Sequence, residues 1–181
     1  MSNLSLVYAP NAIFKTHAKE VTIVNDEIRK IADQMLRIMY QEKAVGLGAN
    51  MVGILQSIAV VDVDIRENGI PNAHIFINPK ITWHSEEMQT FKEASLSFPG
   101  ISAEITRPKA IKLNYLDYEG KKNELEASGF FATVIQHEVD YLSGKVFLDY
   151  LSKFKRDTLL SKMLKYIKLH PPHVHSDKCN H

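Results

Sequence analysis

Cysteine is nearly missing from this sequence, since Cys179 is the one cysteine among 181 residues. A single cysteine near the end of the chain can form no disulfide framework and gives the body of the protein no thiolate ligand. Long apolar runs are also missing, and none approaches the roughly 20 residues that a membrane-spanning helix needs. No signal-peptide pattern opens the chain, so we expect a cytoplasmic protein with no membrane partner.

An excess of charge of one sign is missing as well. Lysine and arginine number 22 and aspartate and glutamate 21, for a formal net charge of +1. This balance gives no electrostatic reason to expect nucleic acid as a partner. Apolar residues make up 45% and charged residues 24%, which is typical of a globular domain. The sequence gives no indication of oligomeric state.

One domain over residues 1–169 is expected, because no composition shift or repeat divides this part of the chain. Residues 170–181 form a different tail, with four histidines and Cys179. Such a cluster could hold a transition metal, but its prolines and terminal position favour disorder.

The periodicity predicts an α+β fold with mostly antiparallel strands. An amphipathic helix begins after Asn25, a good N-cap. Residues 1–21 are expected to form an extended arm, with loops at 66–72 and 93–100 and a hairpin turn at Glu119-Gly120. A final amphipathic helix is expected at 152–169. Alternating segments predict strands at 56–63, 74–78, 80–84, 104–107, 110–118, 123–127 and 145–148.

The stretch 128–142 predicts a central buried helix, because apolar residues occur on nearly every face. Its middle nevertheless carries His137, Glu138 and Asp140, and buried ionisable groups are costly unless each has a partner or a role. His137 and Tyr141 are four residues apart and therefore share a face. The pattern is close to His-Glu-x-x-His, in which two histidines bind metal and the glutamate acts as a base. Here the second histidine position is Tyr141.

Three segments together resemble peptide deformylase, whose motifs are Gly-φ-Gly-φ-Ala-Ala-x-Gln, Glu-Gly-Cys-Leu-Ser and Gln-His-Glu-x-Asp-His-Leu. Here the corresponding residues are 44–51 (AVGLGANM), 93–97 (EASLS) and 136–142 (QHEVDYL). Their order and spacing match, and the resemblance covers nearly everything before the tail. It implies a fold in which mostly antiparallel sheets surround a central buried helix, followed by a C-terminal helix.

The resemblance also implies a chemistry, the removal of the formyl group from the N-terminal methionine of new chains. The family holds a divalent iron or zinc ion with one cysteine and two histidines. Its motif glutamate is the acid and base, and the glutamine side chain and a backbone N–H stabilise the oxyanion. By resemblance, His137 matches a metal ligand, Glu138 the acid and base, and Leu96 the backbone N–H. Matching positions in the substrate cleft are Gly46, Leu47, Glu93 and Arg107.

Three departures from the family pattern fall on this chemistry. Ser95 stands at the cysteine position, Tyr141 at the second histidine and Met51 at the glutamine. A serine hydroxyl and a neutral phenol are weak ligands, because neither loses its proton near neutral pH. Met51 cannot donate a hydrogen bond to an oxyanion.

Three interpretations follow, in order of preference. The first is a deformylase-like protein without metal or activity, which could still bind nascent peptide N-termini or the ribosome. The second is an active hydrolase in which Ser95, Tyr141 and His137 bind a divalent ion, iron or zinc, or a harder ion such as ferric iron. The third is an interaction protein whose cleft is unused. We expect no cofactor at His137.

Overall fold

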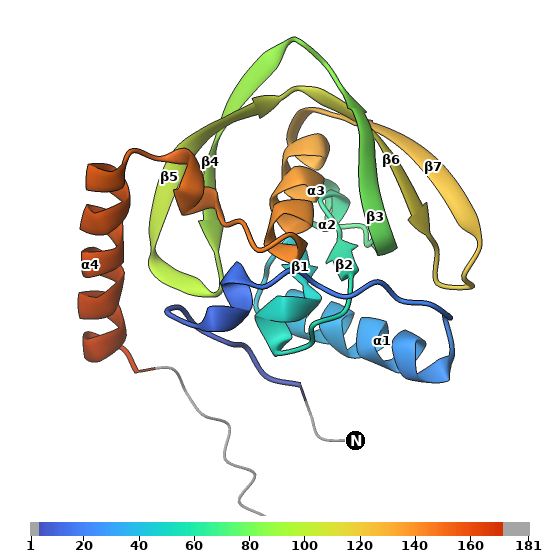
Figure 1. Ribbon diagram of the computed structural model, residues 1–181, viewed down its shortest axis with the longest axis horizontal. Coiled ribbons are helices and arrows are strands. Elements are labelled where there is room, and N and C mark those ends of the chain that lie inside the picture. The colour runs from blue at the N-terminus through green and yellow to red at the C-terminus, as the bar shows by residue number, and fades with distance from the viewer. Residues whose placement is uncertain (1–3, 172–181) are drawn as a thin grey trace, which may run out of the picture.

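The computed structural model describes residues 4–171, and the tail at 172–181 lies outside the described residues. The predicted α+β architecture is confirmed. A central helix, α3 (Gly129–Leu142), lies beneath an arch of antiparallel strands, as Figure 1 shows. Within residues 4–171, no helix is both long and apolar enough to cross a membrane.

The strands form two antiparallel sheets. In the five-stranded sheet the order is β1-β2-β3-β6-β7, and a separate hairpin pairs β4 with β5. The bounds are β1 Gly46–Gly48, β2 Ile58–Val61, β3 His74–His84, β4 Met88–Ser95, β5 Phe98–Pro108, β6 Ala110–Leu116 and β7 Lys122–Ser128. The turn predicted at Glu119-Gly120 joins β6 to β7.

Helix α1 (Asp26–Gln41) begins where the sequence predicts, with the Asn25 side chain accepting a hydrogen bond from the Ile28 N–H. This helix packs against β1 and β2 at the base of the molecule (Figure 1). The arm before it is extended except for one 3-10 turn, η1 (Ala12–Lys15).

Helix α3 is buried on most sides, as its sequence predicts. One apolar cluster packs it against β2, β3, β6 and β7, and a second surrounds its C-terminal end, where Tyr141 lies. Gly144 follows the helix with a φ of +76°, and a Cβ atom there would lie 2.9 Å from the Lys15 carbonyl carbon. Glycine at this position therefore lets the arm cross the end of the central helix.

Two predictions about where strands end were wrong, because a bulge and a tight turn stand where the sequence predicted longer interruptions. The two strands predicted at 74–78 and 80–84 are one strand, β3, which continues through Pro79. Asn78 has a φ of +52°, and the pairing with β6 shifts register between Ile77 and Lys80. Such a bulge accommodates a proline within a strand. The loop predicted at 93–100 is instead a tight turn that ends β4 and begins β5.

Two other segments are helical where the sequence predicted otherwise. Within the loop predicted at 66–72 lies the end of a short helix, α2 (Asp64–Asn68), at whose start Asp62 accepts a hydrogen bond from the Ile65 N–H. The strand predicted at 145–148 is replaced by a 3-10 helix, η3 (Phe147–Tyr150), because Asp149 accepts a hydrogen bond from the Val146 N–H. A further 3-10 helix, η2 (Ala49–Val52), follows β1.

The helix predicted at 152–169 is confirmed as α4 (Lys153–Leu169), and Ser152 is its N-cap. It packs along the outside of β5, away from the central helix (Figure 1).

Candidate functional site

A cavity of about 580 Å³ opens between the central helix, the β4–β5 turn, β1 and the N-terminal arm. Four residues stand at the family's ligand and oxyanion-glutamine positions. Three of them, Met51, Ser95 and His137, line this cavity together. Other residues expected at the site that line it are Gly46, Glu93, Leu96 and Glu138. Segments that are far apart in the sequence thus meet at one cleft.

Two of the four residues matched to the family's substrate cleft lie outside the cavity. Leu47 lies in β1 next to Gly46, which lines the cavity. Neighbouring residues of a strand face opposite sides, and the Leu47 side chain is fully buried in the core. Arg107 is 2% exposed and lies behind Glu93 rather than in the cavity. Its guanidinium group holds other residues of the site in place.

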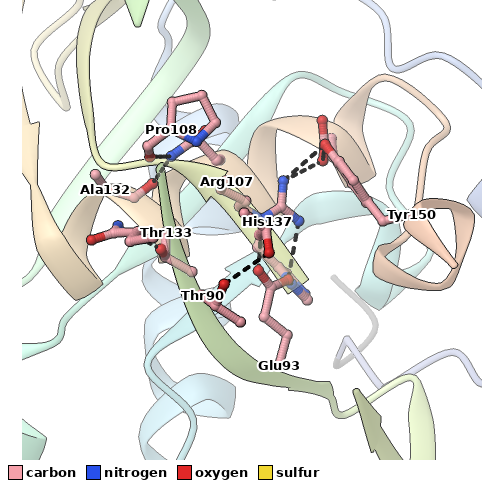
Figure 2. Close-up of polar contacts among 12 residues, drawn as sticks. Thr90, Glu93, Arg107, Pro108, Ala132, Thr133, His137 and Tyr150 are labelled. Carbon is pink, nitrogen blue, oxygen red and sulfur yellow. Dashed lines mark hydrogen bonds and ion pairs between the residues drawn. The ribbon is translucent and has the colours of Figure 1, made fainter. Parts of the chain in front are cut away.

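His137 is held by a chain of charged hydrogen bonds (Figure 2). Its Nδ1 lies 2.8 Å from Glu93 Oε2, and the two Glu93 oxygens accept hydrogen bonds from Arg107 at 2.6 and 3.0 Å. Arg107 also donates to Asp140 and Tyr150, at 2.7 and 3.0 Å. Within residues 4–171, no hydrogen bond engages the other ring nitrogen of His137.

This network sets the charge states of its members. Burial raises the pKa of Glu93, but hydrogen bonds from His137 and Arg107 outweigh it and hold that pKa below its usual range. Burial lowers the pKa of Arg107, but hydrogen bonds and charge interactions with Glu93 and Asp140 have the larger effect, so the pKa lies above its usual value. Glu93 and Arg107 are therefore an ionised, fully paired scaffold behind His137.

Glu138 lies on the next face of α3, against β1. Its side chain passes so close to the backbone that a Cβ atom on Gly46 would lie 2.6 Å from Oε1. Glycine at position 46 leaves room for the Glu138 carboxylate and for the Val134 side chain beside the strand. The residue is 3% exposed, its Oε2 has no partner within the described part of the chain, and burial raises its pKa to about 7.

Tyr141 does not line the cavity, contrary to expectation. Its ring stacks on His137 at 4.7 Å between centroids and packs edge-on against Phe14 and Phe98. Burial raises the pKa of Tyr141 well above its usual value, more than the neighbouring Ser95 hydroxyl lowers it. Its hydroxyl lies beside that of Ser95, but no hydrogen bond of standard geometry joins it to any residue in 4–171. A large aromatic ring is better accommodated in this cluster than in the wet cavity.

Ser95 and Met51 form the remaining walls. Ser95 ends β4, and its hydroxyl accepts a hydrogen bond from the Ser97 N–H at 3.2 Å. Leu96 follows in the turn, at the position of the expected backbone donor. Met51 lies in η2 and is almost fully buried. The cavity wall at residue 51 therefore has no side-chain hydrogen-bond donor.

The sequence analysis missed two supporting residues, Asn50 and Tyr150, and the partner of a third, Asp140. Asn50 donates from Nδ2 to the Tyr141 carbonyl at 2.6 Å, tying η2 to the end of α3. Asp140 and Tyr150 complete the Arg107 network. Asp140 had a signal, since it is an ionisable residue in a buried helix, but its partner could not be identified from the sequence.

Comparison with known proteins agrees with this geometry. A family model for polypeptide deformylase matches residues 3–157. The chain belongs to the polypeptide deformylase family. A protein of Rickettsia conorii called peptide deformylase-like is 65% identical over 97% of this chain and 95% of its own length. Peptide deformylase 1 of the same organism is 41% identical over 91% of this chain and 97% of its own length.

Solved deformylase structures have the same fold. The crystal structure of peptide deformylase from Ehrlichia chaffeensis superposes with a TM-score of 0.86 at 38% identity, over 93% of this chain and 98% of that one. The structure of the Ehrlichia enzyme in complex with actinonin gives a TM-score of 0.85 at 39% identity, over 95% of this chain and all of that one.

Deformylases are metal-dependent hydrolases, so the donor atoms present here must be tested against that metal. Within residues 4–171, no three histidine, cysteine, aspartate or glutamate side chains converge as a metal-binding group. The residues at the family's ligand positions are one imidazole, one serine hydroxyl and one neutral, core-packed phenol. Zinc and ferrous iron are bound in proteins by thiolates, imidazoles and carboxylates, and this donor set does not fit them.

Proposed function

We propose that this chain is a deformylase-family protein without deformylase activity, which keeps the cleft and uses it to bind peptide N-termini. The observation that carries the proposal is the position of Tyr141. Its uncharged phenol is packed among aromatic rings at the position where the family has a histidine ligand. A group that cannot ionise there cannot replace an imidazole as a ligand.

The other two departures, Ser95 and Met51, also remove groups that the family's reaction needs. Ser95 retains its proton near neutral pH, whereas the family's cysteine binds as a thiolate. Met51 offers no hydrogen bond to an oxyanion, and loss of one such donor lowers rates by about 10²–10³ in other hydrolases. This chain thus lacks two of the family's three metal ligands and one of its two oxyanion donors.

What is kept supports a binding role. The cavity, of about 580 Å³, is within the range of roughly 300–1,000 Å³ typical of ligand sites. The Glu93–Arg107 scaffold still holds its wall in place. In Rickettsia conorii, a protein called deformylase-like occurs beside one called peptide deformylase 1, so a separate deformylase accompanies the relative of this chain. Nascent chains at the ribosome, in the cytoplasm, are the expected source of the peptide N-termini.

Elemental analysis combined with a formyl-methionine peptide assay tests the proposal. We expect metal well below one ion per chain and no release of formate, with the Ehrlichia chaffeensis deformylase as a positive control. A stoichiometric ion that disappears in His137→Ala, together with formate release, would establish altered ligation instead. Metal that remains in His137→Ala binds elsewhere, for example in the tail.

A further inference from the structure

Positive side chains predominate at the mouth of the cavity. Among residues 4–171, four exposed charged side chains line it, and three of them, Lys43, Arg66 and Lys92, are basic. We call these three residues the basic rim. The fourth is Glu42, and the other carboxylates that line the cavity are buried. Since the whole chain has a formal net charge of only +1, this excess of positive charge is local.

The basic rim has no counterion of its own. In the described part of the chain, no ion pair joins any of its three side chains to a carboxylate. Charges of one sign that converge on the mouth of a cleft raise the local concentration of ligands of the opposite sign. The rim therefore favours a ligand that carries negative charge outside the buried part of the cavity.

Lys43 occupies its position at a cost to the backbone. It follows α1 with a φ of +55°, in the left-handed region that favours glycine. Its N–H donates to the Tyr40 carbonyl at 3.1 Å, and the Ala44 N–H donates to the Met39 carbonyl at 2.9 Å. Glycine is the usual left-handed residue in this way of ending a helix. A strained non-glycine residue of this kind is more frequent at functional sites, which supports a role for the lysine side chain.

The rim lies outside a buried inner part of the same cavity. Gly46, Met51 and His137 line the inner part and are buried, whereas the side chains of the rim are exposed. A peptide whose first residue reaches the inner part must pass the rim with the residues that follow. An extended chain advances by about 3.3 Å per residue, so its second to fourth residues cover about 10 Å of this path.

We propose that the basic rim selects peptides with acidic side chains directly after the first residue. This rests on the proposed function and narrows its ligand class. Aspartate or glutamate at the second to fourth positions would pair with Lys43, Arg66 and Lys92 in solvent-exposed ion pairs. Each such pair contributes little, but several of one sign give selectivity, because lysine or arginine at the same positions would meet like charges.

Calorimetric titration of the full-length protein with three amidated peptides tests this. The peptides are Met-Glu-Glu-Ala, Met-Ala-Ala-Ala and Met-Lys-Lys-Ala, each with a free and with an N-formylated amino group, and affinities are compared within one form. The amide removes a terminal carboxylate that the rim would itself attract. At about 50 mM salt we expect the glutamate peptide to bind about 5-fold more tightly than the alanine peptide, and the lysine peptide to bind most weakly. At about 0.5 M salt the first difference should shrink below about 2-fold, because exposed charges are screened.

Two neighbouring residues of opposite charge locate the preference. Lys43→Met should lower the preference for the glutamate peptide over the alanine peptide by about 2-fold, and Glu42→Gln should raise it. Lys43→Gly should lower the preference as Lys43→Met does, yet raise the melting temperature, because glycine relieves the left-handed backbone. An unchanged preference in both Lys43 variants would mean that this lysine serves only the end of α1, and would overturn its role at the rim.

Removing the whole rim should abolish the preference. Lys43→Met combined with Arg66→Met and Lys92→Met should bind the glutamate and alanine peptides equally. Lys122→Met is the matched control, because Lys122 lies in β7 and does not line the cavity, so all affinities should stay unchanged. A preference for the glutamate peptide that survives in the triple variant would overturn the assignment to the rim.

Failure of this inference and failure of the proposed function give different results. Equal binding of the glutamate and alanine peptides at low salt, without formate release, overturns the selection by the rim and leaves the proposed function standing. Formate release from the N-formyl peptides overturns the proposed function. Binding of none of the three peptides in either form overturns both.

Discussion

The two sides of His137 differ in how completely their polar groups are paired. On the Nδ1 side, Glu93, Arg107, Asp140 and Tyr150 form a closed network in which every charge has a partner (Figure 2). On the other side, Glu138, which lines the cavity, and Tyr141, which lies in the core beside His137, have buried oxygens with no hydrogen-bond partner among residues 4–171.

This difference separates what holds the fold from what performs chemistry. The residues of the paired network join β4, β5, α3 and η3, so loss of one leaves a buried charge behind. Ser95, Met51 and Tyr141 are positions whose family counterparts act on a metal or an oxyanion. The three departures from the family pattern that bear on its chemistry fall at these positions, and none falls in the paired network.

Breaking the paired side should have the largest effect. Arg107→Met leaves Glu93 and Asp140 without their cation, so we expect the free energy of unfolding to fall by about 3–5 kcal/mol. Urea denaturation followed by circular dichroism measures it. Lys109→Met removes an exposed pair with Glu87 and should cost less than about 1 kcal/mol. Similar losses for the two variants would contradict a structural role for the network.

Rebuilding the unpaired side should restore activity in steps. Ser95→Cys with Tyr141→His supplies a thiolate and a second imidazole, and together they should bind a divalent metal tightly, whereas either alone should not. Adding Met51→Gln should raise the rate of formate release by about 10²–10³. Metal content and formyl-methionine peptide assays measure both. A triple variant that binds metal but gains no rate from Met51→Gln would mean that the turn at Leu96 has shifted.

Sequence reasoning succeeded here where signals were local or came from the family motifs. Asn25 was identified as an N-cap because a cap needs only its own side chain and the next turn. The burial of α3 followed from apolar residues around the whole helix. The joining of Met51, Ser95 and His137 followed from the family resemblance, since no local pattern relates residues so far apart.

The failures have a common physical cause, which is that partners distant in sequence decide the outcome. Pro79 argued for a strand end, but Asn78 forms a bulge and exchanges hydrogen bonds with Val21. Tyr141 was expected in the cleft, but the aromatic rings of Phe14 and Phe98 hold it in the core. The role of Arg107 depends on two carboxylates in other segments, and no spacing rule gives it.

The charge on Glu138 should make stability depend on pH. Its pKa is 4.5 in an ordinary setting and about 7 in the folded protein, so the folded state binds more protons between these values. Stability from this group is therefore complete below pH ~4.5 and is lost as pH rises through ~7, by about 3 kcal/mol. Relative to the unchanged protein, Glu138→Gln should thus gain stability between pH 5 and 8. Parallel thermal melts across this range measure the gain, and a constant difference would contradict the raised pKa.

The smallest change in stability should come from removing the hydroxyl of Tyr150, which belongs to the paired network, or that of Tyr141, which lies on the unpaired side of His137. Tyr150 donates to Asp140 at 2.7 Å, and Arg107 donates to it at 3.0 Å, so Tyr150→Phe should cost about 1 kcal/mol. The Tyr141 hydroxyl is buried beside that of Ser95 without a hydrogen bond of standard geometry in the described chain, so Tyr141→Phe should be neutral or stabilise by up to about 1 kcal/mol. Urea denaturation of the two variants under one set of conditions measures both changes. A clear loss of stability in Tyr141→Phe would mean that its hydroxyl has a partner in solution, and the division between a paired and an unpaired side would then not hold at this residue.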